Sequence, residues 1–262
     1  MATQAKPRLG VFKFASCDGC QLSLLDLEDE LLAIAGEIEI AFFPEASSSC
    51  LKGPYDIALV EGSIITAADV ARIQDVRKDS KYLIAIGACS TTGGIQALRN
   101  WADIDEYVRA VYASPEFIKT LKDSTPIASH VKVDFAINGC PINKQQLLEV
   151  VVALCIGRPP ALPQYSLCME CKRHGNVCVL VAEGTPCLGP VTQAGCGAIC
   201  PASARGCFGC FGPMESANPD ELVAGLLSRG IERGTIQRLL RGFTGNSDVF
   251  RAAGDKLEAT RS

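Results

Sequence analysis

The chain has 262 residues, of which 48% are hydrophobic and 21% are charged, and this composition is typical of a folded globular protein. Its formal net charge of -4 gives no basic surface of the kind that binds nucleic acid, so we expect no nucleic-acid partner. No stretch approaches the roughly 18 apolar residues of a membrane span. The first ten residues contain neither an apolar signal core nor a pair of arginines. We therefore expect a cytoplasmic protein with no membrane span.

Short apolar runs alternate with helical patterns through the first 160 residues. The expected strands cover residues 8–14, 37–43, 55–62, 81–89 and 131–140. The expected helices cover residues 21–35, 66–78 and 143–155, with a short helix beyond Gly93. Strands that alternate with helices in this way indicate a parallel sheet with helices on both faces. The sequence therefore predicts an α/β fold, a flavodoxin-like doubly wound parallel sheet.

A different pattern begins after the proline-rich stretch "GRPPALP" at 157–163, which we interpret as a domain boundary. We expect a flavodoxin-like domain at 1–160 and a small, irregular, cysteine-rich iron–sulfur domain at 161–262. Residues 164–214 are rich in glycine, proline and cysteine and cannot bury enough apolar surface to fold unaided, so bound metal would have to stabilise them. Short helices are expected around 218–230, followed by a mobile polar tail from about Gly245.

The fourteen cysteines are unusual for a chain that we expect in a reducing compartment. Cysteines there serve metal binding or redox chemistry more often than disulfides. Only two histidines are present, which argues against a histidine-rich zinc or copper enzyme.

Four of the cysteines follow predicted strands. Cys17 and Cys20 follow the first strand, Cys89 ends the strand that begins at Lys81, and Cys140 ends the last strand. The carboxyl ends of parallel strands meet at one edge of a sheet, and open α/β sheets bind their ligands there. Four thiolates that converge at this edge would suit one 4Fe–4S cluster.

Other interpretations of these four cysteines remain open. The pair in "CDGC" also fits a thioredoxin-like dithiol, although that chemistry needs neither Cys89 nor Cys140. A structural zinc usually takes two local pairs of ligands. Cys89 and Cys140 could be buried small hydrophobic residues, but the glycines before them suit the close approach of a bulky ligand.

Eight more cysteines lie in the irregular segment, which is enough for two further 4Fe–4S clusters. They are Cys168, Cys171, Cys178, Cys187, Cys196, Cys200, Cys207 and Cys210. The sequence does not indicate which four would form which cluster, and two zinc sites remain an alternative. Twelve ligands for three 4Fe–4S clusters leave Cys50 in a loop and Cys155 on the apolar face of a helix.

The motifs "SCDGCQLSLL", "VEGSI", "IGACSTTGG" and "NGCPI" resemble the small subunit of nickel–iron hydrogenases and, more distantly, the small iron–sulfur subunit of respiratory complex I. The run "CLGPVTQAGCGAICP…CFGC" resembles the cytosolic group 3 hydrogenases, which include NADP-linked sulfhydrogenases. The resemblance spans residues 8–215 and implies that Cys17, Cys20, Cys89 and Cys140 hold the proximal 4Fe–4S cluster. Glu61, at a strand tip, would lie beside that cluster, either with a role in proton or cluster chemistry or as a strand-end cap.

The resemblance also implies a function. The chain would be a non-catalytic electron-transfer subunit, and a separate large subunit would carry the nickel–iron centre. Electrons from dihydrogen would pass through the clusters to a flavin-containing or NAD(P)-binding partner and to further iron–sulfur subunits, or in the reverse direction. Two alternatives remain: a complex I-like subunit that serves a quinone, and a zinc-stabilised scaffold with no redox role.

Overall fold

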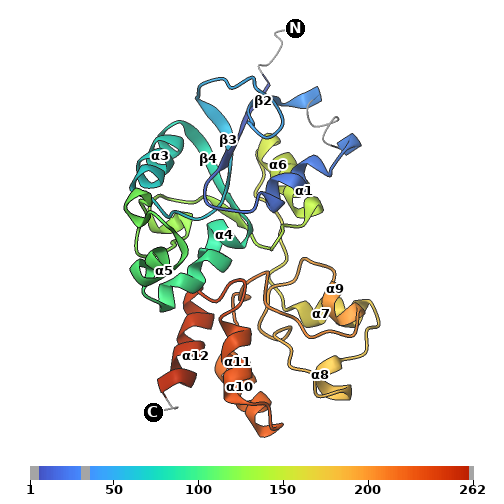
Figure 1. The fold of residues 1–262 in the computed structure, drawn as a ribbon. Coiled ribbons are helices and arrows are strands. Elements are labelled where there is room, and N and C mark those ends of the chain that lie inside the picture. The colour runs from blue at the N-terminus through green and yellow to red at the C-terminus, as the bar shows by residue number, and fades with distance from the viewer. Residues whose placement is uncertain (1–5, 31–35, 260–262) are drawn as a thin grey trace.

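The computed structural model describes residues 6–30 and 36–259. A five-stranded sheet forms the centre of the first half of the chain, and all its neighbouring strands are parallel (Figure 1). The strands are β1 (Arg8–Lys13), β2 (Glu39–Phe42), β3 (Tyr55–Glu61), β4 (Ser80–Ile86) and β5 (Phe135–Ile137). Their order is β2-β1-β3-β4-β5, the order of a flavodoxin-like doubly wound sheet. The predicted fold class is confirmed, and the order of the strands reverses between β1 and β3.

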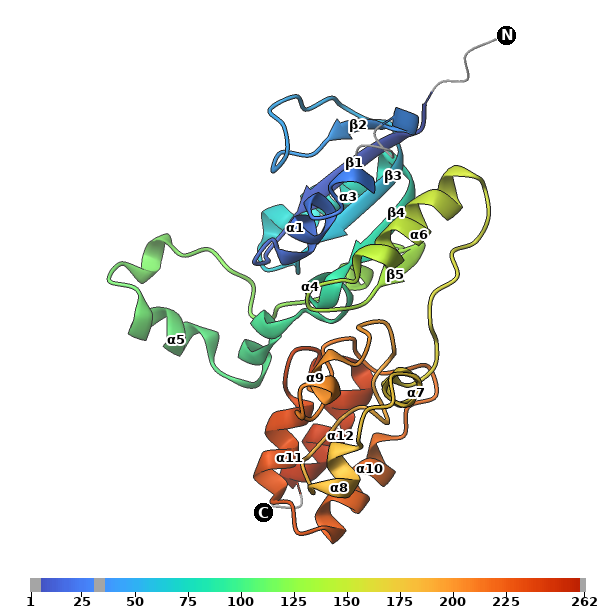
Figure 2. The same ribbon diagram turned by 90° about the vertical axis from the view of Figure 1, so that its right-hand side faces the viewer.

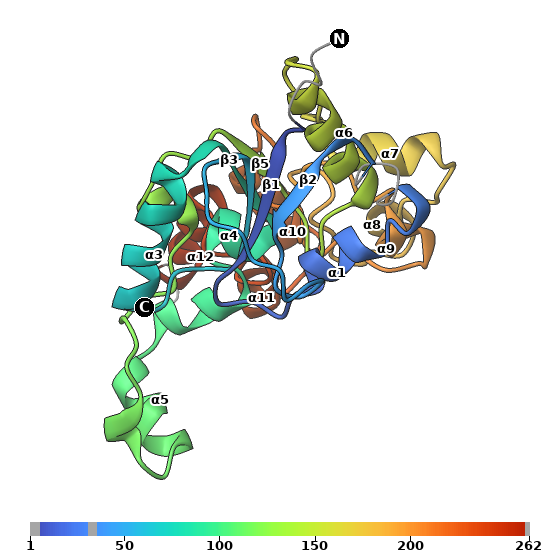
Figure 3. The ribbon, with the colours of Figure 1, turned by 90° about the horizontal axis from the view of Figure 1, so that it is seen from above.

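Helices cover both faces of the sheet, as Figure 3 shows from above. On one face, α1 (Gly19–Leu25) and α6 (Lys144–Cys155) pack against alternate side chains of β1, β3 and β4. On the other face, α3 (Ala67–Lys78) packs against the intervening side chains. Successive strand residues point to opposite faces, so β3 contributes to both cores. Because both faces of the sheet are buried, its strands need apolar residues at successive positions and do not alternate between apolar and polar residues.

The helix starts follow local sequence signals. Thr66 caps α3 in a reciprocal capping box with Asp69, and the Asn143 side chain accepts backbone N–H groups at the start of α6. The helix expected over 21–35 ends at Leu25 instead, and residues 31–35 lie outside the described residues. Glu28, with φ 47°, is in the left-handed region and interrupts the helical path.

Two expected strands are shorter than the sequence pattern suggested. The strand expected over 81–89 ends at Ile86, because Gly87 turns the chain with φ 85° into α4 (Gly87–Thr92). Cys89 therefore lies in a short helix that follows the strand. The strand expected over 131–140 contains only Phe135–Ile137.

A long excursion separates α4 from β5. It contains η1 (Ile95–Trp101), α5 (Ile104–Val111), η2 (Pro115–Phe117) and η3 (Ile127–Ser129). We call residues 102–124 the arm. Figures 2 and 3 show that α5 stands away from the sheet and from the other helices, and α5 contains no buried residue.

The second half of the chain forms a helical and irregular region below the sheet (Figure 1). Its helices are α7 (Leu167–Arg173), α8 (Val179–Ala182), α9 (Ile199–Ala202), α10 (Pro219–Ser228), α11 (Arg233–Leu240) and α12 (Asp248–Ala259). Leu167, Val179 and Leu188 share one apolar core with α10, α11 and α12. The irregular segment is thus packed against these helices as well as around its own cysteines.

The expectation of a mobile tail from Gly245 is wrong for the described residues. Phe250, Ala253 and Leu257 on α12 are buried, because these positions recur at helical spacing and face the core. α12 also reaches the first half of the chain, where the Trp101 indole N–H donates to Asp255 at 3.1 Å. The domain boundary near residue 160 stays a prediction. Among the described residues, no helix is long and apolar enough to cross a membrane.

Candidate functional site

The loop after β1 presents the first two cysteines at the carboxyl edge of the sheet. Cys17 is exposed, whereas Cys20 lies buried in the first turn of α1. Asp18, between them, caps the helix with φ 66° and forms an ion pair with Lys13 at 2.5 Å. The tight turn therefore places one cysteine before the helix N-terminus and the other in its first turn.

Cys89 and Cys140 come from the ends of β4 and β5. Gly139 precedes Cys140 with φ 137°, and its carbonyl accepts the Ala88 N–H at 2.7 Å. This hydrogen bond joins the two loops that carry these cysteines. A Cβ atom on Gly87 would overlap the Cys20 sulfur, so the first turn of α1 and the end of β4 are in direct contact.

The thiols at this edge act on one another electrostatically. The pKa of Cys89 is raised to about 11, chiefly by burial and also by the nearby Cys140 and Cys17 thiols, while the hydrogen bond with Gln96 lowers it. Burial, followed by the charge of Glu61, raises the pKa of Cys20, and Cys89 and Cys140 add to the effect. Four thiols from three strand exits thus lie together at the point where the strand order reverses. Metal binding would replace their protons.

Glu61 holds the start of α1 in place. Its side chain is only 1% exposed, and it accepts the Cys20 backbone N–H at 3.0 Å and the Gln21 side-chain amide at 2.7 Å. Burial raises the pKa of Glu61, while the hydrogen bonds from Gln21 and Cys20 act in the opposite direction. Glu61 therefore positions the backbone of Cys20 at the start of α1.

Two glutamines were not singled out from the sequence. Gln21 orients the Glu61 carboxylate, and Gln96 donates to the Ala15 carbonyl at 2.6 Å while lying 3.5 Å from the Cys89 sulfur. Gln96 thereby joins the Cys17 loop to the Cys89 loop. The sequence signal that could have identified them is their position. Gln21 directly follows the cysteine pair of "CDGC", and Gln96 closely follows the glycine pair at 93–94.

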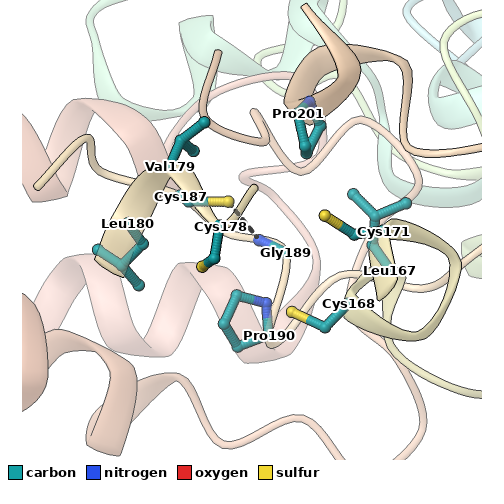
Figure 4. A pocket seen from close by; sticks show the side chains of 10 residues that line it. All are labelled: Leu167, Cys168, Cys171, Cys178, Val179, Leu180, Cys187, Gly189, Pro190 and Pro201. Carbon is teal, nitrogen blue, oxygen red and sulfur yellow. Dashed lines mark hydrogen bonds between the residues drawn. The ribbon is translucent and has the colours of Figure 1, made fainter. Parts of the chain in front are cut away.

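A second set of four cysteines lines a small cavity in the second half of the chain (Figure 4). The set contains Cys168 and Cys171 on α7, Cys178 before α8, and Cys187 in the following loop. Figure 4 shows their sulfur atoms around one space, and the cavity measures about 40 Å³. The pKa of Cys168 is raised to about 11, chiefly by burial and also by Cys187, Cys171 and Cys178.

The remaining four cysteines form a third set around α9: Cys196, Cys200, Cys207 and Cys210. The pKa of Cys210 is raised to about 12, chiefly by burial and also by Cys196, Cys140 and Cys200. Burial also raises the pKa of Cys207 to about 12, against the hydrogen bonds from Gly209 and Thr192. This set was not distinguishable from the second set by sequence spacing.

Backbone contacts place the third set between the other two. Cys210 is close enough to Cys140 of the first set for that thiol to raise its pKa. On the other side, the backbone N–H of Cys207 donates to the Cys187 sulfur of the second set at 3.2 Å. The spatial order therefore differs from the chain order, because residues 168–187 lie at the far end of the row.

The two spare cysteines lie outside these sets. Cys50 is in a loop and Cys155 is the last residue of α6, and both are exposed. The expectation that Cys155 faces the core is wrong, because the helix ends there and its buried positions are Leu147, Val150, Val151 and Ala153.

Each of the three sets offers four thiols, the number of ligands that one 4Fe–4S cluster takes. A tetrahedral zinc requires four sulfurs at about 2.3 Å from one point. Within residues 6–30 and 36–259, no three His, Cys, Asp or Glu side chains come close enough together to hold one ion. A 4Fe–4S cluster, by contrast, accepts four thiolates spread around a cube, each on its own iron. The Cys187 sulfur accepts the backbone N–H groups of Gly189 and Cys207, and the Cys207 sulfur accepts that of Gly209. Hydrogen bonds of this kind tune the sulfurs of a cluster.

Comparisons with known proteins show which family the chain is similar to. The family model of the NADH ubiquinone oxidoreductase, 20 Kd subunit, matches residues 17–154. Sulfhydrogenase 2 subunit delta of Pyrococcus furiosus is 41% identical over 211 residues, which cover 80% of this chain and 88% of that protein. A subunit of the F420-non-reducing hydrogenase vhu of Methanocaldococcus jannaschii is 33% identical over 271 residues, which cover 90% and 94% of the two chains.

Solved structures show the same fold. A crystal structure of an NAD+-reducing NiFe-hydrogenase in the H2-reduced state is 29% identical, with a TM-score of 0.57 over 60% of this chain and 96% of that chain. A crystal structure of the Ni-Fe-Se hydrogenase of Desulfomicrobium baculatum is 17% identical, with a TM-score of 0.53 over 83% of this chain and 97% of that chain. At this identity the similarity shows the fold alone. This chain is thus a member of the NADH ubiquinone oxidoreductase 20 Kd subunit family, in its branch of hydrogenase iron–sulfur subunits.

Proposed function

We propose that this chain is the electron-transfer subunit of a nickel–iron hydrogenase and holds three 4Fe–4S clusters. The observation that carries the proposal is the row of three four-thiol sets, which begins at the switch point of the sheet and ends at Cys178. When bound, the clusters would act as one-electron carriers. The partners would be a large subunit with the nickel–iron centre and a flavin-containing or NAD(P)-binding subunit.

Each part of the chain has a distinct task in this proposal. The first set, with Cys17 exposed, would face the large subunit. Glu61 and Gln96 hold the loops of this set in register, and the buried surroundings of Cys20 and Cys207 keep water from the sulfurs. The second set, with Cys178 exposed, would face the electron-accepting partner.

Two other functions account for fewer observations. A complex I-like subunit serving a quinone would use the first set, but the family model ends at residue 154, before all eight of the later cysteines. A zinc-stabilised scaffold would need thiols that meet at one ion, which the described sets do not provide.

Purification of the chain with its natural partners tests the proposal. We expect a nickel-containing subunit to copurify, and we expect about twelve irons and as many acid-labile sulfides per copy of this chain, because each 4Fe–4S cluster takes four thiolates. Zinc in place of iron and sulfide would support the scaffold. A chain that carries iron but copurifies with a quinone-reactive complex free of nickel would support the complex I-like alternative.

Removal of iron by a chelator should loosen the irregular segment first. Ordering its roughly fifty residues costs about 1–2 kcal/mol per residue, and bound clusters would offset part of that cost. We expect proteolysis within 164–214 to become at least tenfold faster after iron removal, while the sheet remains intact. Mass spectrometry of the fragments measures this difference. Equal resistance of the two forms would show that the shared core with α10–α12 is sufficient by itself.

A further inference from the structure

The arm carries an amphipathic helix with no core to cover it. In α5, Ile104, Tyr107, Val108 and Val111 recur at i, i+3, i+4 and i+7, the spacing of a stripe that normally faces a protein core. No residue of α5 is buried, however, and Val111 is 72% exposed. Phe117, just beyond the helix, is 77% exposed. The arm thus presents an apolar stripe to the outside.

The base of the arm is firmly held. Arg99 donates to the Thr120 hydroxyl at 2.9 Å and to the carbonyls of Leu121 and Asp123 at 2.9 and 3.0 Å. Asn100 and Ser124 exchange two further hydrogen bonds across the base. These contacts fix the direction of the arm before any partner arrives, which lowers the entropy cost of binding.

The apolar stripe continues toward the first thiol set. η1 connects the arm to that set. It begins directly after Gly94, and Gly94 lies against Cys89, since a Cβ atom on this glycine would be 2.7 Å from the Cys89 sulfur. Ile95 and Leu98 are both exposed, and residues three apart in a 3-10 helix lie directly above one another. Exposed apolar side chains therefore run from the Cys89 loop to the tip of the arm.

We propose that the arm is a docking element that inserts its α5 stripe into an apolar groove of the catalytic large subunit. This inference rests on the proposed function, because the large subunit is the partner that must cover the first thiol set. The surface beside Cys89 and the surface of α5 are continuous, so a partner seated on the former meets the latter. An amphipathic helix in a groove is a common mode of protein recognition.

The test replaces exposed side chains that touch no core. The variant Tyr107→Ser/Val111→Ser/Phe117→Ser removes exposed side chains of the arm. The control Leu51→Ser/Val152→Ser/Ile156→Ser removes three exposed apolar side chains far from all three thiol sets, with Ile156 67% exposed. Each variant is coexpressed with the large subunit, and the dissociation constant of the complex between the variant and the large subunit is measured by titration. The arm variant should weaken binding at least tenfold, and the control should leave it within about twofold. Both should keep the wild-type iron content.

The outcomes separate the two proposals. If the wild-type chain binds no nickel-containing subunit, the proposed function fails. If the wild-type chain binds one and the arm variant binds equally well, the arm is not a docking element. If the isolated wild-type chain dimerises while the arm variant is monomeric and still binds the large subunit normally, the stripe serves a second copy and the inference is also wrong.

Discussion

Replacement of Cys89 by serine is expected to lower the iron content by up to about four per chain and to abolish hydrogen-dependent dye reduction by the assembled enzyme. The cause is the loss of one of four thiolates in the first set, since a hydroxyl is a poor ligand for iron in such a cluster. Cys17→Ser and Cys140→Ser should behave in the same way. Iron and sulfide analysis of each purified variant measures the loss directly.

Cys50→Ser and Cys155→Ser are the matched controls. Both cysteines are exposed and lie outside the three sets, so both variants should keep all their iron. The exposure of Cys155 also removes the cost that a buried hydroxyl would carry. If either control lost about four irons while Cys89→Ser did not, the assignment of the ligands would have to be abandoned.

Replacement of Gly87 by alanine is expected to remove the first cluster although all four cysteine ligands are kept. The new Cβ atom would overlap the Cys20 sulfur, since it would lie well inside the 3.0 Å within which real Cβ atoms essentially never approach other heavy atoms. The Cys20 side chain would have to turn away, and its backbone is held by Glu61 at 3.0 Å. We expect a loss of up to about four irons per chain, the number held by one 4Fe–4S cluster.

Gly157→Ala separates this effect from backbone strain. Gly157 has φ 74°, similar to the 85° of Gly87, but an added Cβ atom there would meet nothing within 4 Å. A left-handed alanine costs roughly 1–2 kcal/mol, so this variant should unfold at a slightly lower temperature. It should nevertheless keep its full iron content. Equal iron loss in both variants would mean that strain, and not contact with Cys20, disturbs the site.

The positions and spacing of the strands were readable from the sequence because buried parallel strands are short apolar runs. The convergence of Cys17, Cys20, Cys89 and Cys140 followed from that topology, since parallel strands end at one edge. The reversal between β1 and β3 was implied only by the flavodoxin-like fold assignment and not by any local pattern, because strand order depends on pairing between distant residues.

The parts that sequence reasoning missed depend on long-range contacts. α12 has a clear helical period, but its polar composition suggested a mobile tail, whereas Phe250 and Leu257 lie in the core. The division of the eight later cysteines into two sets follows from backbone paths around Cys187 and Cys207, which no spacing rule gives. The stripe of α5 was present in the sequence, but only the structure shows that nothing in the described chain covers it.

The link between Trp101 and Asp255 also bears on how the protein is made. The two residues are 154 positions apart, and Asn246 likewise donates to the Thr92 carbonyl. At typical synthesis rates of about 5–20 residues per second, the ribosome needs roughly 8–30 s to add the second partner after the first. During that interval the loop that carries Cys89 lacks the contact that Asn246 makes with Thr92. This loop therefore reaches its final set of contacts only when the last part of the chain is synthesised.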